Sequence, residues 1–204
     1  MKTILIFDCE TTGLPGKGKN YEFDYMEFPY IVQLAWKFTR KDKVKNFIIK
    51  PEGYKIPEDV IKLHGITTKY ALSEGDYFEN VIRKFIDDCL FSDIIVGHNI
   101  HFDTSMIKAN VLRLLKGSGK YTMPDNYITI MANALDKSKR VDTMMKTIKF
   151  CNFCIPGSKR LKFPKLSELY FKLFGEEMTG AHNAVNDILA TERCYLELLN
   201  RKLI

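Results

Sequence analysis

Thr3-Ile4-Leu5-Ile6-Phe7-Asp8-Cys9-Glu10, near the start of this 204-residue chain, is the stretch on which the fold prediction depends. Its first five residues are apolar or β-branched, which favours a buried strand at the centre of a sheet. Thr12-Gly13-Leu14-Pro15-Gly16 should then break the strand into a loop. Two acids, Asp8 and Glu10, therefore fall at the end of a strand that is otherwise apolar.

The spacing of these two acids has a chemical consequence. Side chains alternate between the faces of a strand, so Asp8 and Glu10 should point the same way, about 7 Å apart. Two such carboxylates repel each other unless a positive charge, such as a divalent cation, lies between them. Hard oxygen ligands favour Mg²⁺ or Mn²⁺ over zinc. The alternative is that the strand ends before Asp8 and both acids are solvated.

The other apolar segments predict an α/β fold. Residues 31–39 and 44–49 are predicted strands, joined by the polar turn 40–43 into a hairpin, and residues 94–96 are another buried strand. Helical spacing of apolar residues predicts helices over 57–63, 78–86, 102–115, 166–174 and 185–199. Strands that come first and then alternate with helices indicate a mixed sheet flanked by helices. Residues 117–140 carry no pattern that predicts an element.

Composition indicates a folded intracellular protein. Hydrophobic residues make up 46% and charged residues 27%, as in ordinary globular proteins, and the length suits one domain over residues 1–204. No apolar stretch reaches the roughly 18 residues of a membrane-spanning helix, and the N-terminus lacks a signal-peptide pattern. The five cysteines indicate reduced thiols and a cytoplasmic location, with a nuclear one left open. Cys151 and Cys154 lack a second ligand pair nearby, which favours incidental cysteines over a zinc site.

The charge of the chain is mildly basic and unevenly distributed. Lys and Arg outnumber Asp and Glu by 31 to 25, which gives a formal net charge of +6. The bases crowd into one third of the chain, at Lys137, Lys139, Arg140, Lys146, Lys149, Lys159, Arg160, Lys162 and Lys165. This cluster predicts a track for a phosphate backbone or for a partner, and the alternative is a solvated basic face.

Two further acidic motifs follow along the chain. Gly97-His98-Asn99-Ile100-His101-Phe102-Asp103 leads from a strand into a helix near Asp103, where an acid could simply offset the helix dipole. His182 precedes Asp187 by five residues, which on one helix would place their side chains about 140° apart. The two can converge only if His182 lies in the loop before the helix, with Asn183 as the N-cap.

The last predicted helix has a clear apolar stripe. It consists of Val185, Ile188, Leu189, Leu196 and Leu199. Such a stripe predicts the face that packs on the rest of the protein. Asp187 lies opposite this stripe, so the alternative to a functional role is an exposed aspartate on the helix surface.

Together the three motifs resemble those of the DnaQ-like exonucleases that use a histidine general base, the DEDDh group. This group includes proofreading subunits, RNase T-like enzymes and TREX-like enzymes. The motif order is D-x-E, then H-N-x-x-F-D, then H-x₄-D. The resemblance covers most of the chain in five blocks, at residues 6–15, 64–67, 98–103, 142–143 and 181–187. Residues 117–140 depart from it, because this segment looks longer than the core of the family needs.

The resemblance implies an RNase H-like α/β fold, with a five-stranded mixed sheet and helices on both faces. It also implies that Asp8, Glu10, Asp103 and Asp187 hold two divalent ions, Mg²⁺ or Mn²⁺. In such sites one ion lowers the pKa of the attacking water, and the other stabilises the leaving 3′ oxygen. His182 would take the proton of that water, because histidine ordinarily exchanges protons near neutral pH. The alternative for this residue is a surface imidazole in a loop.

The activity implied is 3′→5′ hydrolysis of phosphodiester bonds at single-stranded or frayed ends, with DNA favoured and nucleoside 5′-monophosphates released. The residues implied to contact the terminal nucleotide are Thr11, Leu14, His64, Asn99 and Phe102. Phe102 could stack on a base, or it could belong to the core. RNA trimming remains an alternative, because RNA and DNA differ in contacts to a 2′-hydroxyl. Proofreading would require a polymerase, or another replication or repair protein, as a partner.

Two other classes of protein compete with this interpretation. A phosphatase of the haloacid dehalogenase type also begins with a strand and an aspartate, but it needs Asp-x-Asp where this chain has Glu10. That family also leaves His182 and Asp187 unexplained. A non-catalytic nucleic-acid-binding domain should have lost a catalytic position, whereas all five are filled here. We therefore predict a nuclease with no membrane association and leave the oligomeric state open.

Overall fold

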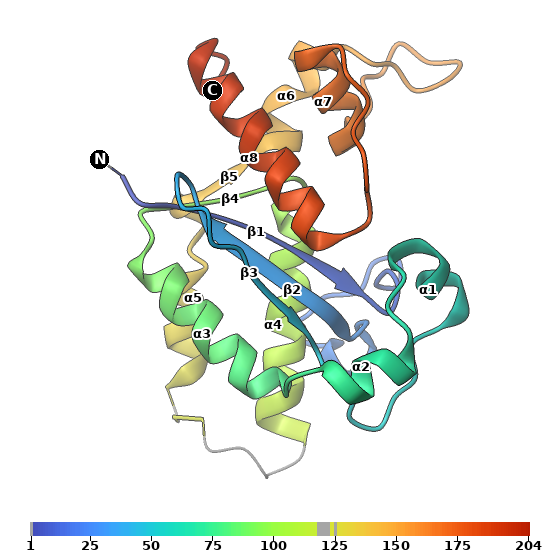
Figure 1. Ribbon diagram of the computed structural model, residues 1–204, viewed down its shortest axis with the longest axis vertical. Helices are drawn as coiled ribbons and strands as arrows, with labels where there is room; N and C mark the ends of the chain where they lie inside the picture. Colours follow the sequence, from blue (N-terminus) through green and yellow to red (C-terminus); the bar gives the residue numbers. More distant parts are fainter. Residues whose placement is uncertain (1, 118–122, 125) are drawn as a thin grey trace.

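The protein is built on one mixed β-sheet (Figure 1), as predicted. The computed structural model describes residues 2–117, 123–124 and 126–204. Within them the strands are β1 (Ile4–Thr11), β2 (Ile31–Phe38), β3 (Lys45–Ile48), β4 (Ile94–Gly97) and β5 (Arg140–Asp142). Their order is β3-β2-β1-β4-β5. β1 runs antiparallel to β2 and parallel to β4, and β2 with β3 forms the predicted hairpin.

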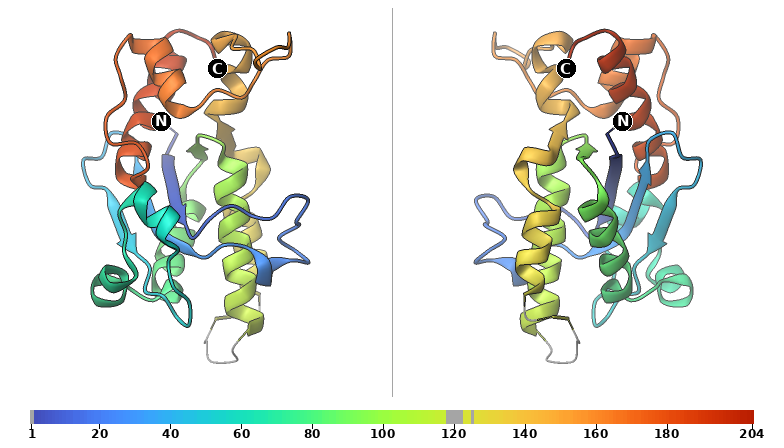
Figure 2. Two further views of the ribbon diagram at one scale, coloured as in Figure 1. Left: turned by 90° about the vertical axis from the view of Figure 1, so that its right-hand side faces the viewer. Right: turned by 90° about the vertical axis from the view of Figure 1, so that its left-hand side faces the viewer.

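Helices cover both faces of this sheet. They are α1 (Glu58–His64), α2 (Thr68–Glu74), α3 (Phe78–Phe91), α4 (Ile100–Gly117), α5 (Tyr127–Ala134), α6 (Thr143–Cys151), α7 (Leu166–Phe174) and α8 (Ala184–Asn200), with short 3₁₀ turns η1 (Tyr25–Glu27) and η2 (Lys137–Lys139). One face carries α3, α4 and α5, and the other carries α8, with α6 and α7 beside it (Figures 1 and 2). The predicted α/β fold is therefore confirmed.

β1 lies in the middle of the core because both of its faces are covered. Leu5 and Phe7 point toward α3 and α4 and are 0% and 1% exposed. Ile6 points toward α8 and is fully buried. Burial of each such side chain contributes about 1.5–3 kcal/mol to the free energy of unfolding. Since side chains alternate along a strand, Asp8 and Glu10 share the face of Ile6 and point toward α8.

The predicted buried stripe of α8 is wrong for its leucines. Leu189, Leu196 and Leu199 are 42%, 37% and 41% exposed. Ile188 of the predicted stripe is buried, and it packs on the sheet together with Ala184 and Tyr195. Cys194 and Leu198 are buried against α6 and α7. Small residues allow the helix to lie close to the sheet, and hydrophobicity alone did not mark them. Asp187 precedes Thr191 by one helical turn, so it lies beside the buried face rather than opposite it.

Most other predicted elements have the expected place. α1 begins directly after Pro57, and α7 ends at Gly175, whose φ of 70° is the left-handed conformation that glycine favours. α5 lies within residues 117–140, where no element was predicted, and buries Tyr127, Met131 and Ala134. Residues 118–122 and 125 of that region lie outside the described residues. No described helix has the length and hydropathy that crossing a membrane requires.

Candidate active site

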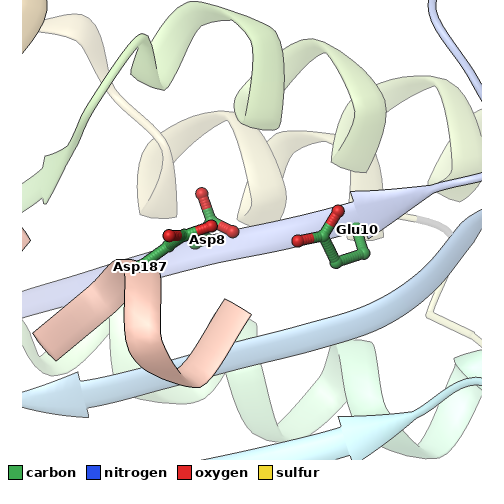
Figure 3. A group of neighbouring side chains, drawn as sticks. All are labelled: Asp8, Glu10 and Asp187. Atoms are coloured by element: carbon green, nitrogen blue, oxygen red, sulfur yellow. The ribbon is translucent and has the colours of Figure 1, made fainter. Parts of the chain in front are cut away.

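Three carboxylates meet between β1 and the start of α8. Asp8, Glu10 and Asp187 each offer a ligand oxygen, and these atoms all lie within 4.8 Å of one another. Figure 3 shows Asp8 and Asp187 close together beside β1, with Glu10 further along the same strand. The predicted same-side placement of Asp8 and Glu10 is therefore confirmed. The strand does not end before them, so the solvated alternative is wrong.

The start of α8 brings Asp187 to this cluster. Asn183 caps the helix, because its side-chain oxygen accepts hydrogen bonds from the backbone N–H groups of Val185 and Asn186. The helix therefore begins after His182, and Asp187 falls in its first turn. His182 lies in the preceding loop with a φ of 64°. This is the arrangement that the sequence required if His182 and Asp187 were to act together.

Asp103 approaches the cluster from the first turn of α4. Only 3% of the residue is exposed, so a solvated acid that merely offsets the helix dipole does not describe it. Its carboxylate accepts hydrogen bonds from the backbone N–H of Cys9, at 3.1 Å, and from the Cys9 thiol, at 3.2 Å. Cys9 stands between the two acids of β1, so it fixes Asp103 against the strand. Sequence analysis missed this role of Cys9.

Burial raises the pKa of all four carboxyl groups, and repulsion from the other acids adds to this at Asp8 and Glu10. The pKa of Asp8 lies well above its ordinary value through burial, and then through Asp103, Asp187 and Glu10. Burial, Asp187 and Asp103 raise the pKa of Glu10 to about 7, and burial raises that of Asp103 to about 7. Burial raises the pKa of Asp187 to about 6, against an opposing hydrogen bond from the backbone of His182.

This cluster fits a divalent cation. Its donors are all carboxylate oxygens, which hard cations such as Mg²⁺ and Mn²⁺ prefer. The causes of the raised pKa values are burial and acidic neighbours, so a cation would relieve both the repulsion and the lost hydration. Cys151 is buried, Cys154 is exposed, and neither belongs to a group of metal-ligating side chains within the described residues.

The raised pKa values predict how stability depends on pH. The folded protein holds these protons more tightly than the unfolded chain does. Without metal, this contribution to the free energy of unfolding is therefore full below about pH 4 and is lost as the pH rises to about 7. Bound Mg²⁺ or Mn²⁺ should restore this contribution to the free energy of unfolding at neutral pH. Thermal unfolding measured across this range, in EDTA and in metal, tests both statements. A metal-independent stability at pH 7 would contradict them.

The loop that carries His182 is tied to α8 by a side-chain hydrogen bond and borders a cavity. The Asn186 side-chain amide donates a hydrogen bond to the Gly180 carbonyl at 3.0 Å. A cavity of 260 Å³ lies between this loop and the helices, lined by Tyr170, Glu177, Met178, Thr179, Asn186, Leu189, Ala190 and Arg193. The residue His182 is exposed, and within the described residues its ring makes no hydrogen bond that would hold it in place. The imidazole is therefore free to turn toward a substrate.

Side chains predicted to contact a nucleotide differ in how available they are. Leu14 is 81% exposed, and Asn99 is exposed at the start of α4 with a φ of 65°. The Thr11 hydroxyl instead donates to the Gly13 carbonyl at 2.6 Å, so it shapes the loop. Phe102 is half-buried and packs partly against the core. Its exposed part can still stack on a base, so both predicted roles remain open.

His64 lies at the end of α1 and is 8% exposed. Its Nδ1 accepts a hydrogen bond from the backbone N–H of Ile66 at 3.0 Å, so the neutral ring carries its proton on Nε2. Burial lowers the pKa of His64, which keeps the ring neutral. Nε2 is buried and has no partner within the described residues. The Nε2–H of His64 is therefore a hydrogen-bond donor without an acceptor among the described residues.

A carboxylate cluster on the central strand of a β3-β2-β1-β4-β5 sheet is the arrangement of a nuclease with the RNase H-like fold. The sequence matches the RNase_T model, described as exonuclease, over residues 5–195. The chain therefore belongs to this family, the DnaQ-like 3′→5′ exonucleases, whose activity depends on divalent metal ions.

Relatives and solved structures agree with this assignment. The chain is 27% identical over 203 residues to the PolC-type DNA polymerase III of Bacillus subtilis, a match over 97% of this chain and 11% of the polymerase. It is 25% identical over 199 residues to the DNA polymerase III subunit epsilon of Aquifex aeolicus, over 97% of this chain and 80% of the subunit. E. coli exonuclease I, solved with a dA16 oligonucleotide, shares the fold at a TM-score of 0.69 and 21% identity, over 100% of this chain and 42% of that chain.

Proposed function

We propose that this protein removes nucleotides one at a time from single-stranded or frayed 3′ ends, with DNA as the favoured substrate, and releases nucleoside 5′-monophosphates. The observation that carries the proposal is the partly buried cluster of Asp8, Glu10 and Asp187, whose ligand oxygens lie within 4.8 Å of one another. Burial raises the pKa of all three, and acidic neighbours raise it further at Asp8 and Glu10, so a bound cation would stabilise their charged forms. The capped start of α8, which presents His182 beside that cluster, supports it.

The carboxylates of Asp8, Glu10, Asp103 and Asp187 would hold two divalent ions, Mg²⁺ or Mn²⁺. When bound, such ions lower the pKa of an attacking water and stabilise the leaving oxygen. Asp103 differs from the other three, because one of its oxygens already accepts two hydrogen bonds from Cys9. We assign it a supporting place, with its second oxygen directed to the site. β1 and α8 hold the other three carboxylates, those of Asp8, Glu10 and Asp187, close together before substrate binds.

His182 acts as the general base in this proposal. It accepts a proton on an imidazole nitrogen from the attacking water and later gives it to solvent. His182 lies in the loop directly before the Asn183 cap and has a left-handed backbone conformation. The hydrogen bond from the His182 backbone to the carboxylate of Asp187 ties the loop to the cluster. One short segment, the loop and first turn of α8, thus positions both the base His182 and the acid Asp187.

The terminal nucleotide would lie against the loop after β1 and the start of α4. Exposed Leu14 offers an apolar contact to the sugar or base, and the side chain of Asn99 offers a hydrogen bond. Thr11 holds the turn that carries Leu14. Phe102, which is half-buried near the start of α4, would contribute a ring to the same pocket. His64 would support the pocket from behind, with its unused Nε2 as a donor.

The names of the relatives suggest a setting for this activity. Both are DNA polymerase III proteins, one of them a subunit, so a polymerase or another replication or repair protein is the partner we propose. The chain spans 11% of the first relative. The predicted cytoplasmic location stays a prediction. Discrimination between DNA and RNA depends on contacts to one 2′-hydroxyl, so the substrate assay must include both.

An end-labelling assay tests the proposal. Single-stranded DNA and RNA of matched sequence, labelled at the 5′ end or at the 3′ end, are incubated with Mg²⁺, Mn²⁺ or EDTA. We expect a 5′-labelled ladder that shortens stepwise, a labelled mononucleotide from the 3′ label, and no reaction in EDTA. Faster cleavage of RNA would reverse the substrate preference. Binding of both without cleavage would favour the non-catalytic domain.

A further inference from the structure

Residues 143–165, the basic segment, contain all of the excess positive charge of the chain. The segment has six lysines and arginines and no acid, and the formal net charge of the whole chain is +6. It consists of α6 and a loop that folds back on itself. The backbone N–H of Ile155 donates to the Arg160 carbonyl, and that of Lys162 donates to the Phe153 carbonyl, each at 2.9 Å. The tip is therefore an ordered hairpin.

Most cations of this segment have no acidic partner. Lys146, Lys149, Lys159 and Arg160 are exposed, and none of them takes part in an ion pair within the described residues. Lys165 is also exposed, but its charge lies near Glu168 and helps to lower the pKa of that acid. Lys162 differs, because it forms an ion pair with Glu168 and lies 5.5 Å from the ring centre of Phe153. Lys162 thus holds the hairpin together, whereas Lys159 and Arg160 at its tip remain available for a polyanion.

His98 fixes both ends of the basic segment to the edge of the active site. Its Nε2 donates a hydrogen bond to the Pro164 carbonyl, and its Nδ1 pairs with the Thr143 hydroxyl, each at 2.9 Å. The next residue, Asn99, donates its backbone N–H to the Asp142 carboxylate at 3.0 Å. The same carboxylate caps α6. The segment is therefore anchored beside the residues proposed to meet the terminal nucleotide.

The segment also presents an aromatic surface. Phe163, directly before the anchored Pro164, is 57% exposed. Figure 2 shows the basic segment and the loop of residues 12–30, which carries Leu14, projecting from the same side of the molecule. Cationic side chains beside an exposed aromatic ring are the combination that binds single-stranded nucleic acid, through phosphate contacts and base stacking.

We propose that the basic segment binds the single strand upstream of the terminal nucleotide. Lys159 and Arg160 contact backbone phosphates, and Phe163 stacks on an unpaired base. His98 holds the segment in line with the catalytic cluster. The inference rests on the proposed exonuclease function and adds to it a second contact region that only substrates longer than a dinucleotide can reach.

Salt dependence of binding tests this assignment. Affinity for a single-stranded oligonucleotide is measured in EDTA over a range of salt concentrations. Each lost phosphate contact flattens the slope of log affinity against log salt by about 0.7, so Lys159→Gln with Arg160→Gln should flatten it by about 1.4. The matched control is Lys41→Gln with Lys43→Gln, which removes the same charge from the exposed turn between β2 and β3 and should leave the slope unchanged. Phe163→Leu should weaken binding without changing the slope.

Hydrolysis of a dinucleotide separates this proposal from the proposed function. A dinucleotide reaches only the catalytic pocket, so the double variant should cleave it as the wild type does and lose efficiency only on long substrates. A wild-type salt slope in the double variant would overturn the proposal, because it would show that Lys159 and Arg160 make no phosphate contact. Failure of the wild type to cleave any substrate would overturn the exonuclease function instead.

Discussion

Asp8→Asn should abolish cleavage while the protein stays folded. Asp8 is part of the carboxylate cluster, and asparagine keeps its shape but loses the charge that holds a cation. Replacing even the outer partners of metal ligands commonly costs about 10- to 100-fold, so loss of a ligand should exceed about 100-fold in kcat. The measurement is single-turnover cleavage of a labelled oligonucleotide in Mg²⁺ and in Mn²⁺.

The same substitution should raise the stability of the metal-free protein. Burial and three acidic neighbours raise the pKa of Asp8, so its charged form opposes folding at neutral pH. The melting temperature in EDTA at pH 8 should therefore be higher for Asp8→Asn than for the wild type. Added Mn²⁺ should stabilise the wild type strongly, since saturation at about 100 times Kd contributes about 2.7 kcal/mol, and should stabilise the variant less.

Asp42→Asn is the matched control for this pair of effects. Asp42 lies exposed in the turn between β2 and β3, so the same chemical change should alter neither activity nor melting temperature. Wild-type activity in Asp8→Asn would show that the first acidic motif does not carry the chemistry. A lower melting temperature in EDTA would show that the Asp8 carboxylate stabilises the fold without metal.

The residues of β1 were the part of the sequence from which most of the fold and of the candidate site could be predicted. An apolar run that ends in D-x-E identified a central strand and two acids on one face, and both expectations hold because strand alternation is a local property. The place of His182 before α8 was also predictable, since only a loop position allowed it to converge with Asp187. Asn183 supplied the cap that this required.

Other features depend on which surfaces of the helices and the sheet pack together, and the sequence did not predict that packing. The leucines of α8 predicted the wrong buried face, because Ala184 and Tyr195 pack on the sheet while Cys194 packs against α6 and α7. Nothing in the sequence around Cys9 predicted a role for it, because its thiol contacts Asp103, a residue of α4 that is 94 positions away. His98 belonged to a recognised motif, yet its contacts to Thr143 and Pro164 span 45 and 66 residues. Such long-range contacts have no local pattern.

His182→Ala should lower kcat by about 10²- to 10⁴-fold, the usual contribution of a general base. Because the imidazole is exposed and makes no hydrogen bond to described residues, its removal should leave the affinity for an oligonucleotide in EDTA unchanged. Alanine is strained at a φ of 64°, whereas asparagine tolerates this conformation, so His182→Asn separates loss of the base from a distorted loop. Both variants should be equally slow.

His101→Ala is the matched control, since His101 is also exposed but lies in α4 outside the cluster. A loss of affinity at constant kcat would assign His182 to substrate binding. If His182→Asn were active and His182→Ala were not, the loop conformation rather than the imidazole would be what catalysis requires.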